Sequence, residues 1–324
     1  MTELDLPRVF VTRRLPGDAL ERLAQSVTID LWPGELPPPY NELRRRTANA
    51  HAIISLLTDN IDAALIDAAR SLRVISNVAV GHDNIDFRAA AKRGIRVGNT
   101  PGVLTETTAD LAFALILATA RRVVEADRFV RDGRWRTWDP SLLLGHDVHG
   151  ATLAIVGFGA IGRAVARRAR GFNMRVLYAT THDAATDDAE LGTRVDLDTL
   201  LREAAFVSLH VPLTPLTVKM IGERELHMMR DDAVLVNTSR GGVVDQAALA
   251  RALTDGWIAG AGLDVAEIEP IPAGDPLLRA PNVVLLPHIG SASHATRARM
   301  ASMAVDNCLA GLRGEPLPHE VIAR

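Results

Sequence analysis

The chain has 324 residues, of which 48% are hydrophobic and 23% charged, and its formal net charge is −3. This length predicts two domains, and the near-neutral charge gives no reason to expect a nucleic-acid or membrane partner. The N-terminus lacks the pattern of a signal peptide, and no apolar run is long enough to span a bilayer. The single cysteine, Cys308, excludes an intrachain disulfide and a cysteine-based zinc cluster, and no histidine spacing predicts a metal site. We therefore expect a cytoplasmic protein.

Apolar runs alternate with helix-like segments before Pro101. The predicted strands cover residues 8–12, 52–57, 74–79 and 95–97, and the predicted helices cover 18–25, 63–70 and 87–93. This alternation is typical of a small α/β domain with a parallel sheet.

After Pro101 and Gly102, residues 104–120 predict a long helix that is apolar nearly all round. Such a helix is buried on several sides, against its own chain or a second subunit. Residues 123–149 show few helix or strand signals, so we expect an irregular segment. It is either an arm that reaches across a dimer or an ordinary surface loop, and Trp138 is either a contact to the partner's site or part of the packing at the arm's base.

A β-prone run over 152–156 leads into Gly157-Phe-Gly-Ala-Ile-Gly162, and an Ala- and Arg-rich helix follows over 163–170. In a dinucleotide-binding turn, the first glycine permits the turn, the second admits the pyrophosphate and the third allows close helix packing. The helix N-terminus offers free N–H groups to the phosphates. The pattern thus predicts cofactor contacts at Phe158, Gly159, Ala160 and Ile161, and the alternative is a purely structural turn.

A second alternating series follows this turn. Its predicted strands cover residues 175–178, 206–210, 233–237, 258–264 and 283–286, and its helices cover 197–204, 223–229 and 246–255. The helix over 295–312 is expected to return to the first domain. The predicted fold is α/β, with two Rossmann-like doubly wound parallel-sheet domains. A dinucleotide-binding domain (101–288) is inserted into a split substrate-binding lid domain (1–100 and 289–324), with a cleft between them.

Arg240, Glu269 and His288 lie at predicted strand ends or in the loops that follow them, where α/β folds collect ligands. A guanidinium can hold a carboxylate and a neighbouring carbonyl, and a histidine can transfer a proton near neutral pH. A carboxylate on the other ring nitrogen would fix the imidazole tautomer. Each residue alone also has a structural interpretation. Arg240 is compatible with a surface ion pair, Glu269 with an ordinary loop acid, and His288 with a structural turn histidine.

Together with the glycine turn, these residues form a more specific pattern. The chain resembles the D-isomer-specific 2-hydroxyacid dehydrogenases over essentially its whole length, and it is most similar to glyoxylate/hydroxypyruvate reductases. The segments that carry the resemblance are Gly157 to Gly162, Val207-Ser-Leu-His-Val-Pro-Leu-Thr214, Asn237-Thr-Ser-Arg-Gly241, Gly262-Leu-Asp-Val265 with Glu269-Pro270, and Pro287-His-Ile-Gly-Ser291. The subfamily is indicated by Val9-Phe-Val-Thr-Arg-Arg14, by residues 92–98 and 103–110, and by Ala310-Gly-Leu-Arg-Gly-Glu-Pro-Leu-Pro318.

The resemblance implies a role for each matching residue. His288 would donate a proton during reduction, Glu269 would be its partner, and Arg240 would clamp the substrate. Val80 and Gly81 would offer backbone N–H groups to the substrate carboxylate, with Ser291 as a further substrate contact. Asp264 would face the nicotinamide amide, and the remaining implied cofactor contacts are Thr108, Val211, Thr238 and Gly290.

The second strand of the dinucleotide-binding domain ends near Thr180, where NAD-specific folds usually carry an acidic residue. The carboxylate that would repel a 2′-phosphate is missing at that position. Thr180, Thr181 and His182 are able to bind a 2′-phosphate. The sequence therefore favours NADP(H) over NAD(H).

The resulting functional hypothesis is NAD(P)H-dependent reduction of glyoxylate to glycolate or of hydroxypyruvate to D-glycerate, by a homodimer. One alternative is a D-2-hydroxyacid dehydrogenase with another substrate, such as phosphoglycerate or a bulkier acid. A second, from a different class, is a nucleotide-sensing binding protein similar to the corepressors that share this fold. Oxidation of NADPH that depends on a 2-oxo acid would separate the enzyme from the binding protein.

Overall fold

The computed structural model describes residues 6–181 and 188–322. The chain divides into two compact units, which we name the split unit (Met1–Leu104 with Ser291–Arg324) and the inserted unit (Thr105–Gly290). The divisions fall at 104/105 and 290/291, whereas the sequence predicts them at 100/101 and 288/289. Among the described residues, no helix is both long and apolar enough to span a membrane.

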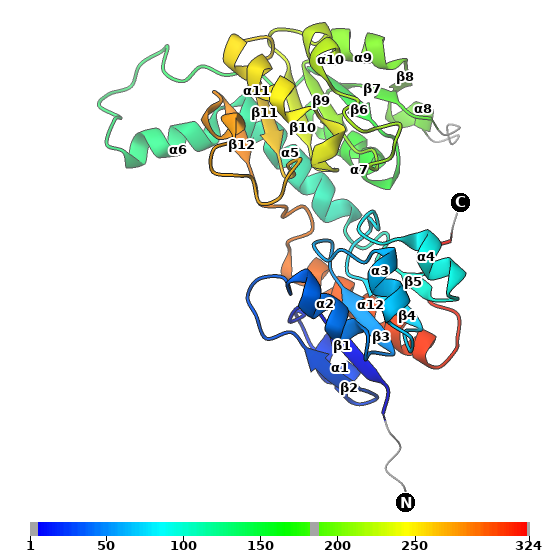
Figure 1. The fold of residues 1–324 in the computed structure, drawn as a ribbon. Coiled ribbons are helices and arrows are strands. Elements are labelled where there is room, and N and C mark those ends of the chain that lie inside the picture. Colours follow the sequence, from blue (N-terminus) through cyan, green and yellow to red (C-terminus); the bar gives the residue numbers. More distant parts are fainter. Residues whose placement is uncertain (1–5, 182–187, 323–324) are drawn as a thin grey trace, which may run out of the picture. The chain divides into compact units, whose positions relative to one another are not determined.

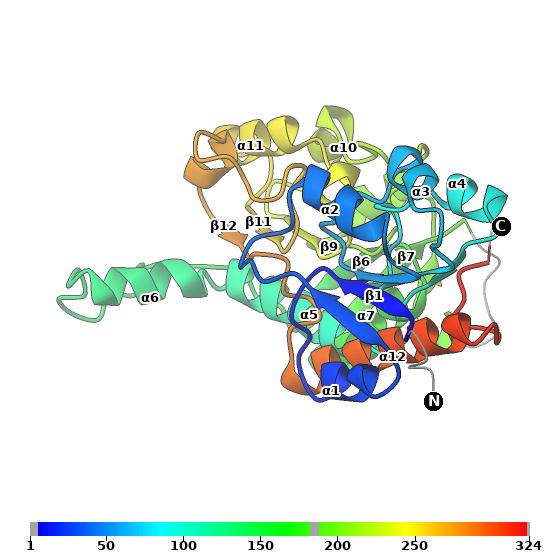
Figure 2. The same cartoon turned by 60° about the horizontal axis from the view of Figure 1, so that its bottom comes forward.

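The split unit is a five-stranded parallel sheet in the order β2-β1-β3-β4-β5. Its strands are β1 (Arg8–Val11), β2 (Thr28–Leu31), β3 (Ala52–Ser55), β4 (Val74–Asn77) and β5 (Arg96–Gly98). Its helices are α1 (Ala19–Ala24), α2 (Tyr40–Thr47), α3 (Ala63–Ala68), α4 (Phe87–Lys92) and α12 (His294–Leu312). Helices α1 and α12 cover one face of this sheet, and α2, α3 and α4 cover the other (Figure 2). Helix α12 therefore returns the chain to the unit in which it began.

The inserted unit is a seven-stranded parallel sheet in the order β12-β11-β10-β9-β6-β7-β8 (Figure 1). Its strands are β6 (Thr152–Val156), β7 (Arg175–Ala179), β8 (Thr193–Arg194), β9 (Phe206–Leu209), β10 (Val234–Asn237), β11 (Gly260–Leu263) and β12 (Val283–Leu285). Its helices are α5 (Thr105–Ala120), α6 (Val123–Arg131), α7 (Ala160–Ala169), α8 (Asp188–Leu191), α9 (Leu197–Glu203), α10 (Glu223–Met228) and α11 (Gln246–Asp255), with 3-10 turns η1 (Arg170–Phe172), η2 (Gly241–Val243) and η3 (Pro276–Arg279). The predicted fold class, two parallel-sheet α/β domains, is confirmed.

Two apolar cores enclose the inserted sheet. Helices α5 and α7 bury side chains against one face, and α9, α10 and α11 bury theirs against the other. The predicted all-round apolar helix is α5, which buries residues that include Phe113, Leu115 and Ile116. Local signals set the bounds of α11, because the Asp245 side chain accepts a hydrogen bond from the Ala248 N–H and Gly256 ends the helix in the left-handed region at φ 72°.

The prediction of an irregular segment over 123–149 is wrong in its first part, because Val123–Arg131 forms helix α6. This helix extends away from the sheet of its unit (Figure 1) and contains no buried residue. Its nine residues form an amphipathic helix, but they are fewer than the roughly 11 residues over which helical periodicity is read in a sequence. Strand β2 and helix α2 were likewise not predicted. Strand β2 lies at the sheet edge, where incomplete burial weakens the apolar pattern.

Candidate active site

The order of strands in the inserted unit reverses between β6 and β9, and open α/β sheets bind ligands beside the carboxyl ends of strands at such a point. The glycine turn follows β6 at this position. Gly157 has φ +94°, and a Cβ there would lie 2.6 Å from the His210 carbonyl oxygen and 2.8 Å from Val211 Cγ1. The turn therefore packs directly against the segment that follows β9, which brings the predicted contact Val211 beside it.

The glycine turn leaves room where a pyrophosphate would approach. A Cβ at Gly159 would have no neighbouring atom within 4 Å, and Ala160, which begins α7, is exposed. A Cβ at Gly162 would lie only 2.3 Å from the Gly157 carbonyl oxygen, so this helix and turn require glycine there. These features fit the phosphates of a dinucleotide.

The Phe158 ring has a structural role. It is buried and stacks on Tyr178, with the ring centroids 3.9 Å apart. Only the backbone of Phe158 is thus available to a cofactor. His210, after β9, is also structural, because its Nε2 lies 2.8 Å from Ser208 Oγ and burial lowers its pKa to about 4. The imidazole of His210 is therefore neutral at physiological pH.

His288 and Glu269 form the pair that the sequence predicts. The His288 Nδ1 lies 2.8 Å from Glu269 Oε2, and Glu269 Oε1 accepts a hydrogen bond from the Ala266 N–H at 3.0 Å. Burial raises the pKa of Glu269, but the hydrogen bonds from His288 and the Ala266 N–H, together with the charges of His288 and Arg240, leave that pKa below its ordinary value. Glu269 is thus held as a carboxylate on one ring nitrogen of His288.

Asp264 holds the turn that carries His288. Its Oδ1 accepts from the Ile289 N–H and its Oδ2 from the Gly290 N–H, both at 2.7 Å, while its carbonyl accepts from the His288 N–H. Burial raises the pKa of Asp264 above its ordinary value, and the hydrogen bonds from these two backbone donors offset only part of this increase. His288 itself adopts the left-handed φ of 58°. The sequence did not reveal this anchoring role, because the residues involved lie more than twenty positions apart.

Two further predicted cofactor residues lie at this edge of the sheet. Thr108 of α5 is buried, and a Cβ at Gly290 would lie 3.5 Å from its Oγ1. Thr238, directly after β10, is buried, and within the described parts of the chain its Oγ1 has no hydrogen-bond partner. An unsatisfied buried hydroxyl at the carboxyl edge fits a cofactor that supplies the missing partner.

Arg240 lies beside the pair. It adopts an extended backbone conformation before η2, and its charge contributes to lowering the pKa of Glu269. The next residue must be glycine, because a Cβ at Gly241 would lie 1.9 Å from the Ala266 carbonyl. This close approach brings the loops after β10 and β11 together, so the structure places Arg240, Glu269 and His288 in one corner of the inserted unit.

The predicted carboxylate contacts Val80 and Gly81 follow β4 in the split unit. The Asn99 Nδ2 donates to the Val80 carbonyl at 2.8 Å, and the Asn77 Nδ2 donates to the Gly81 carbonyl at 3.0 Å. Both carbonyls are therefore occupied by asparagine side chains that sequence reasoning missed. Ser291, also in the split unit, is half-buried, and its carbonyl accepts from the Ser293 N–H.

Thr180 and Thr181 follow β7, next to the glycine turn, because the Gly157 N–H donates to the Ala179 carbonyl at 2.9 Å. The third residue predicted here, His182, lies outside the described residues. The Thr180 carbonyl accepts a hydrogen bond from Arg194, at the end of β8. The chain thus has a cation at this position that the sequence did not reveal.

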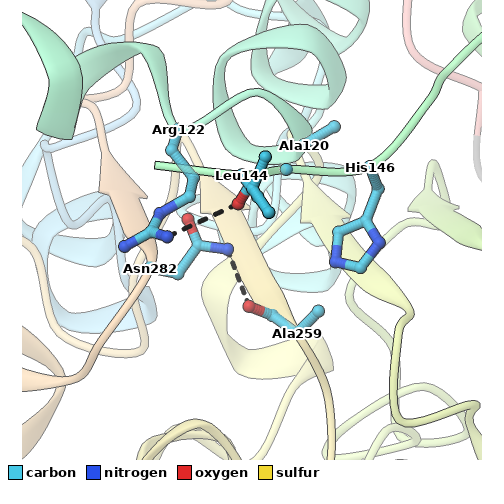
Figure 3. A pocket seen from close by; sticks show the side chains of 7 residues that line it. Ala120, Arg122, Leu144, His146, Ala259 and Asn282 are labelled. Carbon is cyan, nitrogen blue, oxygen red and sulfur yellow. Dashed lines mark hydrogen bonds between the residues drawn. The ribbon is translucent and has the colours of Figure 1, made fainter. Parts of the chain in front are cut away.

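A pocket of about 160 Å³ in the inserted unit is lined by Ala120, Arg122, Leu144, Gly145, His146, Ala259 and Asn282. In Figure 3, Arg122 points to the Leu144 carbonyl and Asn282 to that of Ala259. Ala259 and Asn282 precede β11 and β12, so this pocket lies at the amino ends of these strands, away from the predicted site. None of the predicted site residues lines it.

Comparison with known proteins agrees with this geometry. Residues 113–290 match the NAD-binding domain model of the D-isomer-specific 2-hydroxyacid dehydrogenases. A glyoxylate reductase from Korarchaeum cryptofilum is 57% identical over 317 residues, which cover 97% of this chain and 96% of that protein.

Solved structures are similar along the whole chain. A protein from Thermus thermophilus has a TM-score of 0.92 and 49% identity, with 97% of this chain and 100% of that chain covered. An NADPH-dependent glyoxylate/hydroxypyruvate reductase from Sinorhizobium meliloti, in complex with NADP and malonate, has a TM-score of 0.84 and 35% identity, with coverage of 97% and 96%. The chain belongs to the D-isomer-specific 2-hydroxyacid dehydrogenases, an oxidoreductase family.

Proposed function

We propose that this enzyme reduces small 2-oxo acids with NAD(P)H, converting glyoxylate to glycolate and hydroxypyruvate to D-glycerate. The observation that carries the proposal is the His288–Glu269 pair, 2.8 Å apart, in the same corner as Arg240. Relatives named glyoxylate reductase support the choice of substrate.

The chemistry assigns one task to each residue of the corner. When bound, the nicotinamide cofactor supplies the hydride that reduces the 2-oxo carbon. Glu269 accepts a hydrogen bond at Nδ1 of His288, so that Nε2 delivers its proton to the developing alkoxide oxygen. Arg240 holds that oxygen and stabilises its growing negative charge.

We assign the backbone N–H groups of Val80 and Gly81 to the substrate carboxylate, and Ser291 to a further substrate contact. The Asn99 bond to the Val80 carbonyl orients the peptide group that carries the Gly81 N–H, and the Thr100 N–H bond to the Ala79 carbonyl orients the one that carries the Val80 N–H, before substrate arrives. In the inserted unit, we assign cofactor contacts to the glycine turn and to Thr108, Thr180, Thr181, Val211, Thr238, Asp264 and Gly290.

We also propose that the preferred cofactor is NADP(H). No acidic side chain follows β7 at Thr180 or Thr181, so these positions carry no carboxylate that would repel a 2′-phosphate. The complex of the Sinorhizobium meliloti relative with NADP supports this preference. Measurement of kcat/KM with NADPH and NADH tests it, and a strong NADH preference would refute it.

A homodimer is the proposed assembly. The arm over residues 123–149 exposes Val130, Trp135, Trp138 and Leu144, and Trp138 is 77% exposed. Apolar groups gathered on one segment mark an interaction surface, and a second copy of the chain is the partner that we propose.

The decisive experiment measures oxidation of NADPH and NADH with a panel of 2-oxo acids. Glyoxylate and hydroxypyruvate are expected to give the highest kcat/KM. His288→Ala is expected to lower kcat by about two orders of magnitude or more, because it removes the proton donor, while cofactor affinity persists. Turnover close to that of the wild type would refute the assignment of His288.

A further inference from the structure

Arg194 brings a positive charge to the carboxyl end of β7. It is the last residue of β8, which pairs in parallel with β7 and aligns Arg194 with Tyr178. The Arg194 Nη2 donates to the Thr180 carbonyl at 3.0 Å. The guanidinium therefore lies beside the first residue after β7, although it is far from that residue in sequence.

The end of β7 is where a dinucleotide fold selects its cofactor. Strand β7 is the neighbour of β6, and the glycine turn after β6 is hydrogen-bonded to Ala179, the last residue of β7. In such folds an acidic residue here binds the ribose 2′-hydroxyl of NAD, whereas an arginine nearby accommodates the 2′-phosphate of NADP. This chain has threonine at the first position and Arg194 next to it.

The nearest described acid in sequence, Asp196, is engaged elsewhere. Asp196, two residues further on, caps α9, with Oδ1 accepting from the Thr199 N–H at 2.9 Å and Oδ2 from the Thr199 hydroxyl at 2.8 Å. Within the parts of the chain that the structure describes, no ion pair joins Arg194 to an acidic side chain. A guanidinium carries five N–H donors, and the bond to Thr180 uses one of them.

We infer that Arg194 recognises the 2′-phosphate of NADP(H) and is the chain's main determinant of cofactor preference. The inference rests on the proposed NADP(H) preference. Arginine suits this task, because its planar donor fork matches phosphate geometry and stays charged at every relevant pH. Thr180 and Thr181 then add hydrogen-bonding groups next to this cation.

The test uses adenosine 2′,5′-bisphosphate and 5′-AMP, which differ only in the 2′-phosphate and need no turnover. Arg194→Gln is expected to raise the Kd for the bisphosphate, measured by calorimetry, about tenfold or more and to leave that for 5′-AMP unchanged. The KM for NADPH should rise by a similar factor while that for NADH stays constant. Arg194→Lys should retain part of the affinity.

Arg175→Gln is the matched control. Arg175 begins β7, at the opposite end of the strand, and pairs with Glu203 at 2.9 Å, so its loss should leave both Kd values unchanged. Equal effects of Arg194→Gln on the two ligands, or none on either, would overturn the inference, as would wild-type protein that binds both ligands equally. Absence of 2-oxo acid reduction with either cofactor would instead refute the proposed function, and the two binding constants would still report on Arg194.

Discussion

The corner that carries His288 and the arm over 123–149 belong to the same unit, yet they are ordered in opposite ways. In the corner, Asp264 accepts from two consecutive backbone N–H groups, and Glu269 bridges the Ala266 N–H and the His288 ring. In the arm, α6 has no buried residue, and Trp135 and Trp138 are 61% and 77% exposed. Hydrogen bonds within the chain fix the geometry of the corner. In the arm, by contrast, the described residues of the chain leave apolar side chains exposed.

After the loss of His288 itself, the largest effect is expected from the charge that orients this histidine. Glu269→Gln removes a charged hydrogen-bond acceptor from Nδ1, so kcat should fall about 10- to 100-fold, while the oligomeric state stays the same. Steady-state kinetics and analytical ultracentrifugation measure the two quantities. Unchanged kcat would show that the pair is structural.

The same variant tests the pH dependence of stability. The folded-state pKa of Glu269 is lowered, so the pair stabilises the protein above the ordinary Glu pKa of 4.5, and this contribution is lost as the pH falls through the lowered value. As the pH falls from 4.5 through the lowered pKa, the Tm of the wild type should therefore decrease more steeply than the Tm of Glu269→Gln.

A smaller effect is expected at the anchor of the turn. Asp264→Asn retains one acceptor oxygen but turns an amide N–H₂ toward the other backbone donor, which costs about 1–3 kcal/mol of unfolding free energy. Denaturant titration measures this loss, and kcat should fall with it because the His288 turn loosens. An unaltered unfolding free energy would mean that the two backbone N–H groups find other partners.

The smallest effect on the single chain is expected in the arm. Val130→Asp lies on exposed α6, so it should change the unfolding free energy of the monomer by no more than about 0.5 kcal/mol. Sedimentation should nevertheless show a shift from dimer to monomer, because a charge enters the proposed interface. Arg131→Gln, which removes only the exposed pair with Asp127, is the control and should leave the dimer intact. A Val130→Asp protein that remains dimeric would place the interface elsewhere.

The difference between corner and arm also explains which features were predictable. The strand, glycine turn and helix around Gly157 follow from contiguous residues, and so do the N-cap at Asp245 and the C-cap at Gly256. Helix α6 was not predicted, because its nine residues are too few for their helical periodicity to stand out in the sequence. Strand β2 was missed because its four residues are only partly buried at the sheet edge.

By itself, the sequence determined the fold class and indicated the candidate site residues, because hydrophobic periodicity, glycine spacing and strand-end positions are local properties of the chain. Only the tertiary structure decided that Asp264 anchors the His288 turn, that Asn99 holds the Val80 carbonyl and that Arg194 lies beside Thr180. These contacts join residues from different strands and loops. Parallel pairing and loop packing bring such residues together, and no pattern of neighbouring residues encodes them.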